Sequence, residues 1–188
     1  RSFHVTGVQT CALPILSVTP GNPRSIDQDT INRARTMTGI VIGGGEPVLN
    51  FSTETLLSQL DAEQLISIHF NGTVLPRSSF LSASSKFKNI RYVFSLDGIG
   101  ERFEYLRWPA KWDKVASNVL WLLNNVPNNI EFGLNITISQ LNQNYYTEVL
   151  DWVEQNIPTN QQGKPTYISY NHTGNILSQK YLEICTDF

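Results

Sequence analysis

The sequence predicts an α/β protein built on one parallel β-sheet, and three observations lead to that prediction. Short apolar and β-branched runs alternate along the chain with segments whose apolar residues recur at helical spacing. Such alternation favours parallel strands joined by right-handed helical crossovers. Each predicted strand also ends in a cluster of small polar residues, and functional loops follow the carboxyl ends of parallel strands.

The first half of the chain supplies two helices and two strands. Ser25 is followed three residues later by Gln28, which is a capping-box pattern and predicts a helix that starts at Ser25. Ser52 or Thr53 is the expected cap of the second helix. The apolar run at 38–42 is typical of a strand buried on both faces. In chain order, these elements are a helix from Ser25, a strand at 38–42, a helix at 52–60 and a strand at 65–70.

The second half continues the alternation. Val115, Val119, Leu122 and Leu123 lie on one face of a predicted amphipathic helix. Pro158 is expected to stop the last helix. The expected elements are a short helical or irregular segment at 80–87, strands at 90–96, 130–138 and 166–170, and helices at 112–125 and 145–157. The chain is therefore expected to form five strands in one domain.

Composition excludes several classes of protein. The chain has 188 residues, 40% of them hydrophobic and 16% charged, with a formal net charge of −2, so one globular domain is expected. This balance gives no sign of a nucleic-acid partner or a membrane surface, and no apolar run has the length of a membrane span. The two cysteines form no disulfide framework and no metal-ligand spacing, so the expected location is the reducing cytoplasm.

The first fifteen residues are expected to be an artefact. VTGVQTCALPI, at 5–15, matches the translation of a widely used sequencing-library adapter, and residues 1–4 fit the adapter's arm and an index barcode. The alternative is a short N-terminal strand. On the adapter hypothesis the domain covers 16–188, and the native protein begins upstream of Leu16.

Polar residues at the strand ends are expected to converge on one rim of the sheet. Glu46 stands out, because it lies between glycines and a proline, and its carboxylate suits a cationic group such as an ammonium. The glycines before it permit close backbone approach to a ligand. Any single cluster can equally be an ordinary turn. The clusters are Gly43, Gly44, Gly45 and Glu46; Asn71, Gly72 and Thr73; Ser95, Asp97 and Gly98; Asn135 and Thr137; Asn171, His172 and Gly174.

Three stretches resemble one enzyme family. GGGEP after the first predicted strand, NGTVLP after the second and SLDGIGERFEYLRWPAKWDKV after the third resemble radical S-adenosylmethionine (SAM) enzymes. They are most similar to the subgroup of twitch-domain radical SAM proteins, over roughly 25–158. The resemblance implies a partial (β/α)6 TIM-like barrel of parallel strands.

The resemblance also implies a reaction and a cofactor site. Family members cleave SAM reductively at a [4Fe–4S] cluster, which yields a 5′-deoxyadenosyl radical that abstracts hydrogen from a substrate. The parent protein would then take electrons from a flavodoxin or ferredoxin and act on a peptide or a small metabolite that the sequence does not specify. By the resemblance, SAM-binding residues are Gly44, Gly45 and Glu46 at the methionine ammonium, Ser95 and Asp97 near the ribose, His172 beside the adenine, and Asn71, Asn135 and Thr137 as further contacts.

One departure from the family is large. Its C-x3-C-x2-C cluster motif is absent, since Cys11 and Cys185 each stand alone. We therefore expect the first strand and the cluster loop to be missing from this chain, and the chain as given to hold no cluster and to be inactive. An extension could start near 175–188, where Cys185 is either a ligand of an auxiliary cluster or a small apolar residue.

Other interpretations stay open. The chain could be a hydrolytic (β/α) enzyme that pairs Glu46 with Asp97 or Glu101, or a non-catalytic domain that binds a nucleotide-like ligand. The charged and aromatic stretch at 101–112 could pack on the barrel or form a partner surface. His69 is either a satisfied strand residue or a ligand.

Overall fold

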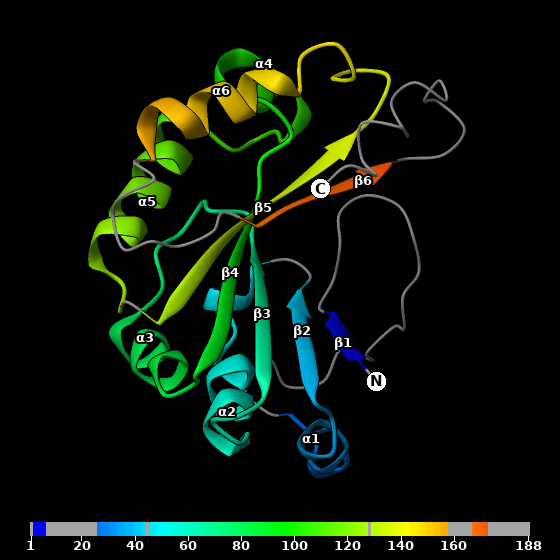
Figure 1. The fold of residues 1–188 in the computed structure, drawn as a ribbon, viewed down its shortest axis with the longest axis vertical. Coiled ribbons are helices and arrows are strands. Elements are labelled where there is room, and N and C mark those ends of the chain that lie inside the picture. The colour runs from blue at the N-terminus through cyan, green and yellow to red at the C-terminus, as the bar shows by residue number, and fades with distance from the viewer. Residues whose placement is uncertain (1, 7–25, 44–45, 128, 158–166, 173–188) are drawn as a thin grey trace.

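The computed structural model describes residues 2–6, 26–43, 46–127, 129–157 and 167–172. Its elements alternate between strand and helix through most of the chain (Figure 1). In order they are β1 (Ser2–Thr6), α1 (Gln28–Arg35), β2 (Gly39–Gly43), the 3₁₀ turn η1 (Pro47–Leu49), α2 (Phe51–Gln59), β3 (Leu65–Phe70), α3 (Ser78–Ser85), β4 (Asn89–Ser95), α4 (Gly100–Leu106), α5 (Trp112–Asn125), β5 (Ile130–Ile138), α6 (Thr147–Asn156) and β6 (Tyr167–His172).

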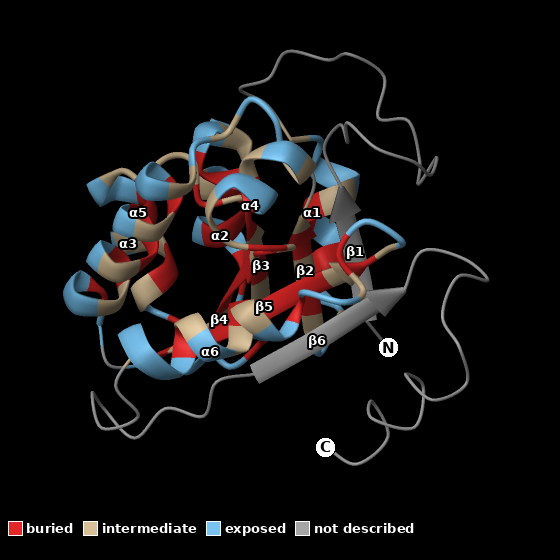
Figure 2. Cartoon of the chain, turned by 90° about the horizontal axis from the view of Figure 1, so that it is seen from above, coloured by how far each residue is buried: buried red, intermediate tan, exposed pale blue. Residues whose placement is uncertain are grey.

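All described strands belong to one sheet in the order β1-β2-β3-β4-β5-β6, and every neighbouring pair is parallel. Seen from above, buried residues lie along the central strands and on the sides of the helices that face them (Figure 2). Sequential strands that neighbour in space and are joined by helices are what an alternating βα pattern favours. The prediction of an α/β partial barrel is confirmed.

The N-terminal edge differs from the expectation of five strands with the first missing. β1 pairs with β2 in register from Ser2 opposite Gly39 to Thr6 opposite Gly43. The physical reason is that an uncovered edge of β2 presents backbone N–H and C=O groups that any extended segment can bind. The alternative of a short N-terminal strand therefore holds for Ser2–Thr6, while the adapter origin of residues 1–15 stays a prediction.

Two helix caps also differ from the sequence prediction. The N-cap of α1 is Asp27, whose Oδ1 accepts from the Thr30 N–H at 2.8 Å and whose Oδ2 accepts from the Thr30 hydroxyl at 2.7 Å. The N-cap of α2 is Asn50, whose Oδ1 accepts from the Ser52 N–H at 3.0 Å. In both helices the longer acceptor side chain reaches the free amides, so Ser52 and Thr53 lie inside α2 rather than capping it.

The core lies between the sheet and its helices. The Tyr92 hydroxyl hydrogen-bonds Ser84 Oγ of α3 at 2.5 Å, and the rings of Phe70 and Phe80 pack edge to face. Even-numbered residues of β3 and β4 therefore face the helices. The rings of Phe94 and Phe132 are stacked on this same layer, 6.0 Å apart.

The opposite face of the sheet is only partly covered. Residues of β2 alternate between buried and half-buried, and β3 continues the same alternation after its exposed first residue, so β2 is not buried on both faces as predicted. Ser67 and His69 of β3 lie on the less covered inner face, because successive side chains of a strand point to opposite sides. Arg91 and Glu131 form an ion pair of 2.9 Å on that inner face.

The aromatic stretch at 101–112 divides between the two interpretations left open. Phe103 is fully buried, and Trp112 packs between the rings of Phe103 and Trp152. Tyr105 and Trp108, in contrast, are 74% and 83% exposed. One half of the stretch therefore anchors α4, and the other half lies at the surface.

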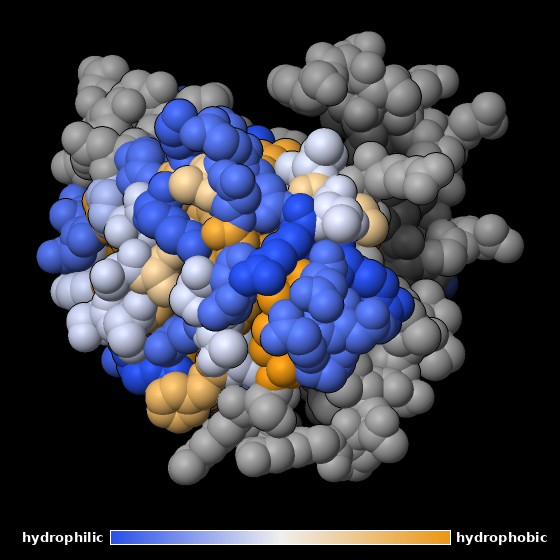
Figure 3. Space-filling view, turned by 90° about the horizontal axis from the view of Figure 1, so that it is seen from below, coloured by the Kyte–Doolittle hydropathy of each residue, from blue (hydrophilic) through white to orange (hydrophobic). Residues whose placement is uncertain are grey.

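The lower end of the molecule is mostly hydrophilic. Seen from below, hydrophilic residues cover most of the described surface, and hydrophobic residues form a narrow central band and a few smaller patches (Figure 3). Among the described residues, no helix combines the length and the apolar character needed to span a bilayer.

Candidate functional site

Glu46 follows β2 at the carboxyl edge of the sheet. β2 ends at Gly43, and Gly44 and Gly45 lie outside the described residues. Pro47 then opens the turn η1, where its fixed φ suits the first helical position. Glu46 is the N-cap of this turn, but its side chain makes no cap hydrogen bond and is directed elsewhere.

The carboxylate of Glu46 is half satisfied. Its Oε2 accepts the backbone N–H of Asn71 at 3.1 Å. Its Oε1 is buried and has no hydrogen-bond partner within the described part of the chain. Burial raises the pKa of Glu46 to about 7, and nearby backbone N–H groups, first that of Asn71, oppose the rise. A buried acceptor without a donor costs free energy unless a ligand supplies one.

The loop after β3 holds the donor for Glu46. Asn71 Oδ1 accepts from the Thr73 N–H at 2.9 Å and from the Thr73 hydroxyl at 2.7 Å, so the loop is a closed Asx turn. Gly72 has a φ of 75°, a backbone conformation that favours glycine. Its carbonyl accepts from Asn118 Nδ2 of α5 at 2.8 Å. The turn is therefore fixed from inside and from behind.

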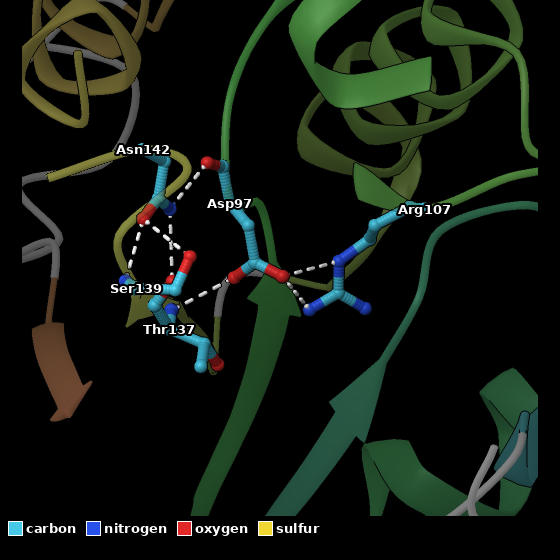
Figure 4. A network of polar contacts seen from close by, with 5 residues as sticks. All are labelled: Asp97, Arg107, Thr137, Ser139 and Asn142. Atoms are coloured by element: carbon cyan, nitrogen blue, oxygen red, sulfur yellow. Dashed lines mark hydrogen bonds and ion pairs between the residues drawn. The ribbon is translucent and has the colours of Figure 1, made fainter. Parts of the chain in front are cut away.

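Asp97 joins the ends of β4 and β5 (Figure 4). The backbone pairing of these strands ends with Ser95 opposite Asn135. Beyond it, Asp97 Oδ1 accepts the Thr137 N–H at 2.7 Å, and Asp97 Oδ2 accepts Arg107 Nε at 2.7 Å. Arg107 Nη2 also lies 2.6 Å from Oδ2. Both carboxylate oxygens of Asp97 are thus engaged by the protein.

Asn142 completes this network. It is 1% exposed, and its Nδ2 donates to the carbonyls of Asp97 and Thr137 at 2.8 and 2.9 Å. Its Oδ1 accepts the Ser139 N–H at 2.7 Å. Two side chains, those of Asp97 and Asn142, therefore take over where the backbone ladder between β4 and β5 stops (Figure 4).

The remaining predicted site residues lie along the same edge of the sheet. Ser95 is half-buried and Asn135 buried at neighbouring register positions of β4 and β5. His172 ends β6 opposite Ile138 of β5. The structure brings Glu46 together with Asn71, Ser95 with Asn135, and Asp97 with Thr137. His69 lies beside the end of β2, where a Cβ at Gly43 would be 3.7 Å from the His69 Cβ.

The described residues do not form a metal site or a carboxylate pair around Glu46. The described residues include no group of three or more His, Cys, Asp or Glu side chains that could hold a metal ion. Cys11 and Cys185 both lie outside the described residues. Glu101 is exposed on α4, and Asp97 is paired with Arg107, so neither offers Glu46 a free carboxylate partner.

Three residues of this region were not predicted from the sequence: Arg107, Asn118 and Asn142. Asn118 lies between Val115 and Val119 on the buried face of α5, and a polar residue on an apolar stripe is a signal that could have identified it. No local pattern marks Asn142, whose partners are distant along the chain or set by its turn. Arg107 stands among other charges, from which the sequence does not distinguish it.

The fold is similar to that of solved structures of SuiB from Streptococcus suis. SuiB matches with a TM-score of 0.59 at 16% identity, over 85% of this chain and 39% of that one. SuiB bound to S-adenosylmethionine gives 0.56 at 17%, over 79% and 34%, and SuiB bound to the precursor peptide SuiA gives 0.52 at 17%, over 70% and 28%. This chain thus spans well under half of those chains. No protein-family model matches it, and neither does any curated protein.

Proposed function

We propose that this chain is part of a radical SAM enzyme and that Glu46 binds the ammonium of the methionine moiety of SAM. The observation that carries the proposal is the buried Oε1 of Glu46, which lacks a donor within the described residues. An ammonium is a compact charged donor that would satisfy this oxygen. The similarity in fold to SuiB, which has been solved with SAM bound, supports this choice of ligand.

The other strand ends would bind the uncharged parts of the ligand. Ser95 and Asn135 offer a hydroxyl and an amide at adjacent positions, where ribose hydroxyls could bind. Asp97 would act indirectly, because Arg107 and the Thr137 amide already occupy its oxygens. Gly44, Gly45 and His172 remain predicted contacts.

The cluster does not fit the described residues. A [4Fe–4S] cluster needs cysteine thiolates, and the described ranges contain none. No step of the proposal therefore runs through the cluster. The cluster, the reductive cleavage of SAM and the flavodoxin or ferredoxin donor belong to the proposal for a longer parent protein, as do its cytoplasmic location and twitch extension.

For the substrate we propose a peptide or a small metabolite. Support comes from the half-covered inner face of the sheet, with Ser67 and His69, and from the precursor peptide bound to SuiB. The hydrolytic alternative lacks support, because Glu46 has no free carboxylate partner in Asp97 or Glu101.

A binding experiment tests the proposal. SAM would be titrated into the 188-residue chain at neutral pH and followed by NMR, which also detects weak binding. Glu46→Gln should weaken binding about tenfold or more, since a charge-assisted hydrogen bond contributes roughly 1.5–3 kcal/mol.

Glu101→Gln is the matched control. It removes the same charge from an exposed position on α4 and should leave the SAM dissociation constant within about twofold. Equal weakening by both variants, or none by Glu46→Gln, would contradict the assignment of the ammonium to Glu46.

A further inference from the structure

We propose that Asn118, on α5, is a positioning residue for Glu46, because it holds the loop after β3 whose backbone amide orients the Glu46 carboxylate. This inference rests on the proposed function, since it names a residue that prepares the same site. Asn118 acts through Gly72, whose carbonyl it binds, and through the Asn71 N–H that reaches Glu46.

Asn118 connects α5 to the loop after β3. Asn118 is 2% exposed, and its Nδ2 donates to the Gly72 carbonyl at 2.8 Å. A buried amide on an apolar helix face would be costly without such a partner. The side chain therefore has one defined place, and so does the carbonyl that it binds.

The loop packs closely against α5 at Gly72. Its φ of 75° turns the chain, and a Cβ there would lie 3.1 Å from Val115 Cγ1 and 3.7 Å from Val119 Cγ2. The loop is therefore packed closely against α5 on both sides of Asn118. Rigid contact of this kind transmits the position of the helix to the loop.

The same loop holds the carboxylate of Glu46. The residue before Gly72 donates its N–H to Glu46 Oε2 at 3.1 Å, and this bond leaves Oε1 as the oxygen without a partner in the described residues. If the loop shifts, Oε2 loses its donor, and the carboxylate is free to rotate. Asn118 thus determines which oxygen is available to a ligand.

The experiment uses the unliganded 188-residue chain first, so that it does not depend on SAM. In Asn118→Leu the side-chain volume is kept and the donor is lost. The NMR titration midpoint of the Glu46 carboxyl should then rise by about half a pH unit, because N–H groups that favour the charged form withdraw. SAM affinity, measured next, should fall about threefold or more.

Gln64→Leu is the matched control, because Gln64 is also a buried amide and its Nε2 donates to the Ala34 carbonyl at 2.9 Å at the opposite end of the sheet. It should lower stability without moving the Glu46 midpoint. If Asn118→Leu does not fold, Asn118→Ser is expected to give the same rise. If a folded Asn118 variant leaves the Glu46 midpoint unchanged or lowers it, the positioning role is overturned. If Glu46→Gln still loses SAM binding in that case, the proposed function stands without a role for Asn118.

Discussion

Ionisation of Glu46 should destabilise the folded chain as pH rises, and Glu46→Gln should remove that effect. Burial raises the pKa of Glu46 from 4.5 to about 7 in the folded chain. A carboxyl whose pKa is higher when folded binds more protons in the folded state, so the free energy of unfolding decreases as the pH rises from the lower of these two pKa values to the higher. Below pH 4.5 the full contribution is present, and above pH 7 it is lost.

The size of this loss of stability follows from the difference between the unfolded and folded pKa of Glu46. Each pH unit corresponds to about 1.4 kcal/mol, so ionising Glu46 in the folded chain costs roughly 3 kcal/mol by pH 8. About two fifths of this cost should already appear by pH 5.5. Glutamine is close to the protonated carboxyl in size and carries no charge at any of these pH values.

Urea unfolding of both chains from pH 4 to pH 8 measures the effect. The unfolding free energy of Glu46→Gln minus that of the wild type should grow by about 3 kcal/mol over this range. Groups that titrate in the same way in both chains cancel in the difference. Glu101→Gln, exposed on α4, should show a nearly constant difference. A constant difference for Glu46→Gln as well would refute the buried, poorly solvated carboxylate on which the site is built.

Two further substitutions test the loops around the site. Asp97→Asn should lower the unfolding free energy by about 1.5–3 kcal/mol, because Arg107 loses its charged partner in a mostly buried position. Asp29→Asn, which breaks an exposed ion pair with Arg33, is the control and should cost under about 1 kcal/mol in the same urea series. Gly72→Ala should destabilise the fold more than Gly100→Ala. Both glycines have positive φ, which costs an alanine about 1–2 kcal/mol at either position, but only the Cβ at Gly72 meets Val115. Equal losses of stability in thermal melting would contradict that packing.

The sequence predicted the repeated elements well because each carries its own periodic signal. Val115, Val119 and Leu122 mark the buried face of α5, and that helix spans the predicted residues. The strand at Leu65–Phe70 and the strand at Ile130–Ile138 also have the predicted bounds. These signals are local, so nothing from the rest of the fold was needed to interpret them.

The errors concern choices that depend on competition or on distant contacts. Asp27 and Asn50 cap their helices because their acceptors reach the free amides better than the neighbouring residues do. β1 forms at the open edge of β2, a strand that the expectation of five strands left out. The acid at the site, Glu46, could be predicted from its glycine and proline neighbours. Its partner Asn71 was predicted too, but not that the contact would be made by its backbone.

The two faces of β3 place different demands on the chain. Ile66, Ile68 and Phe70 are buried against the helices, whereas Ser67 and His69 lie on the half-covered face. Under the proposed function, substitutions at 67 and 69 would therefore alter contacts on this face and leave the packing of the core in place. In such a strand one residue of each pair is constrained by the packing of the core, and the other is open to substitutions that change only the surface of the inner face.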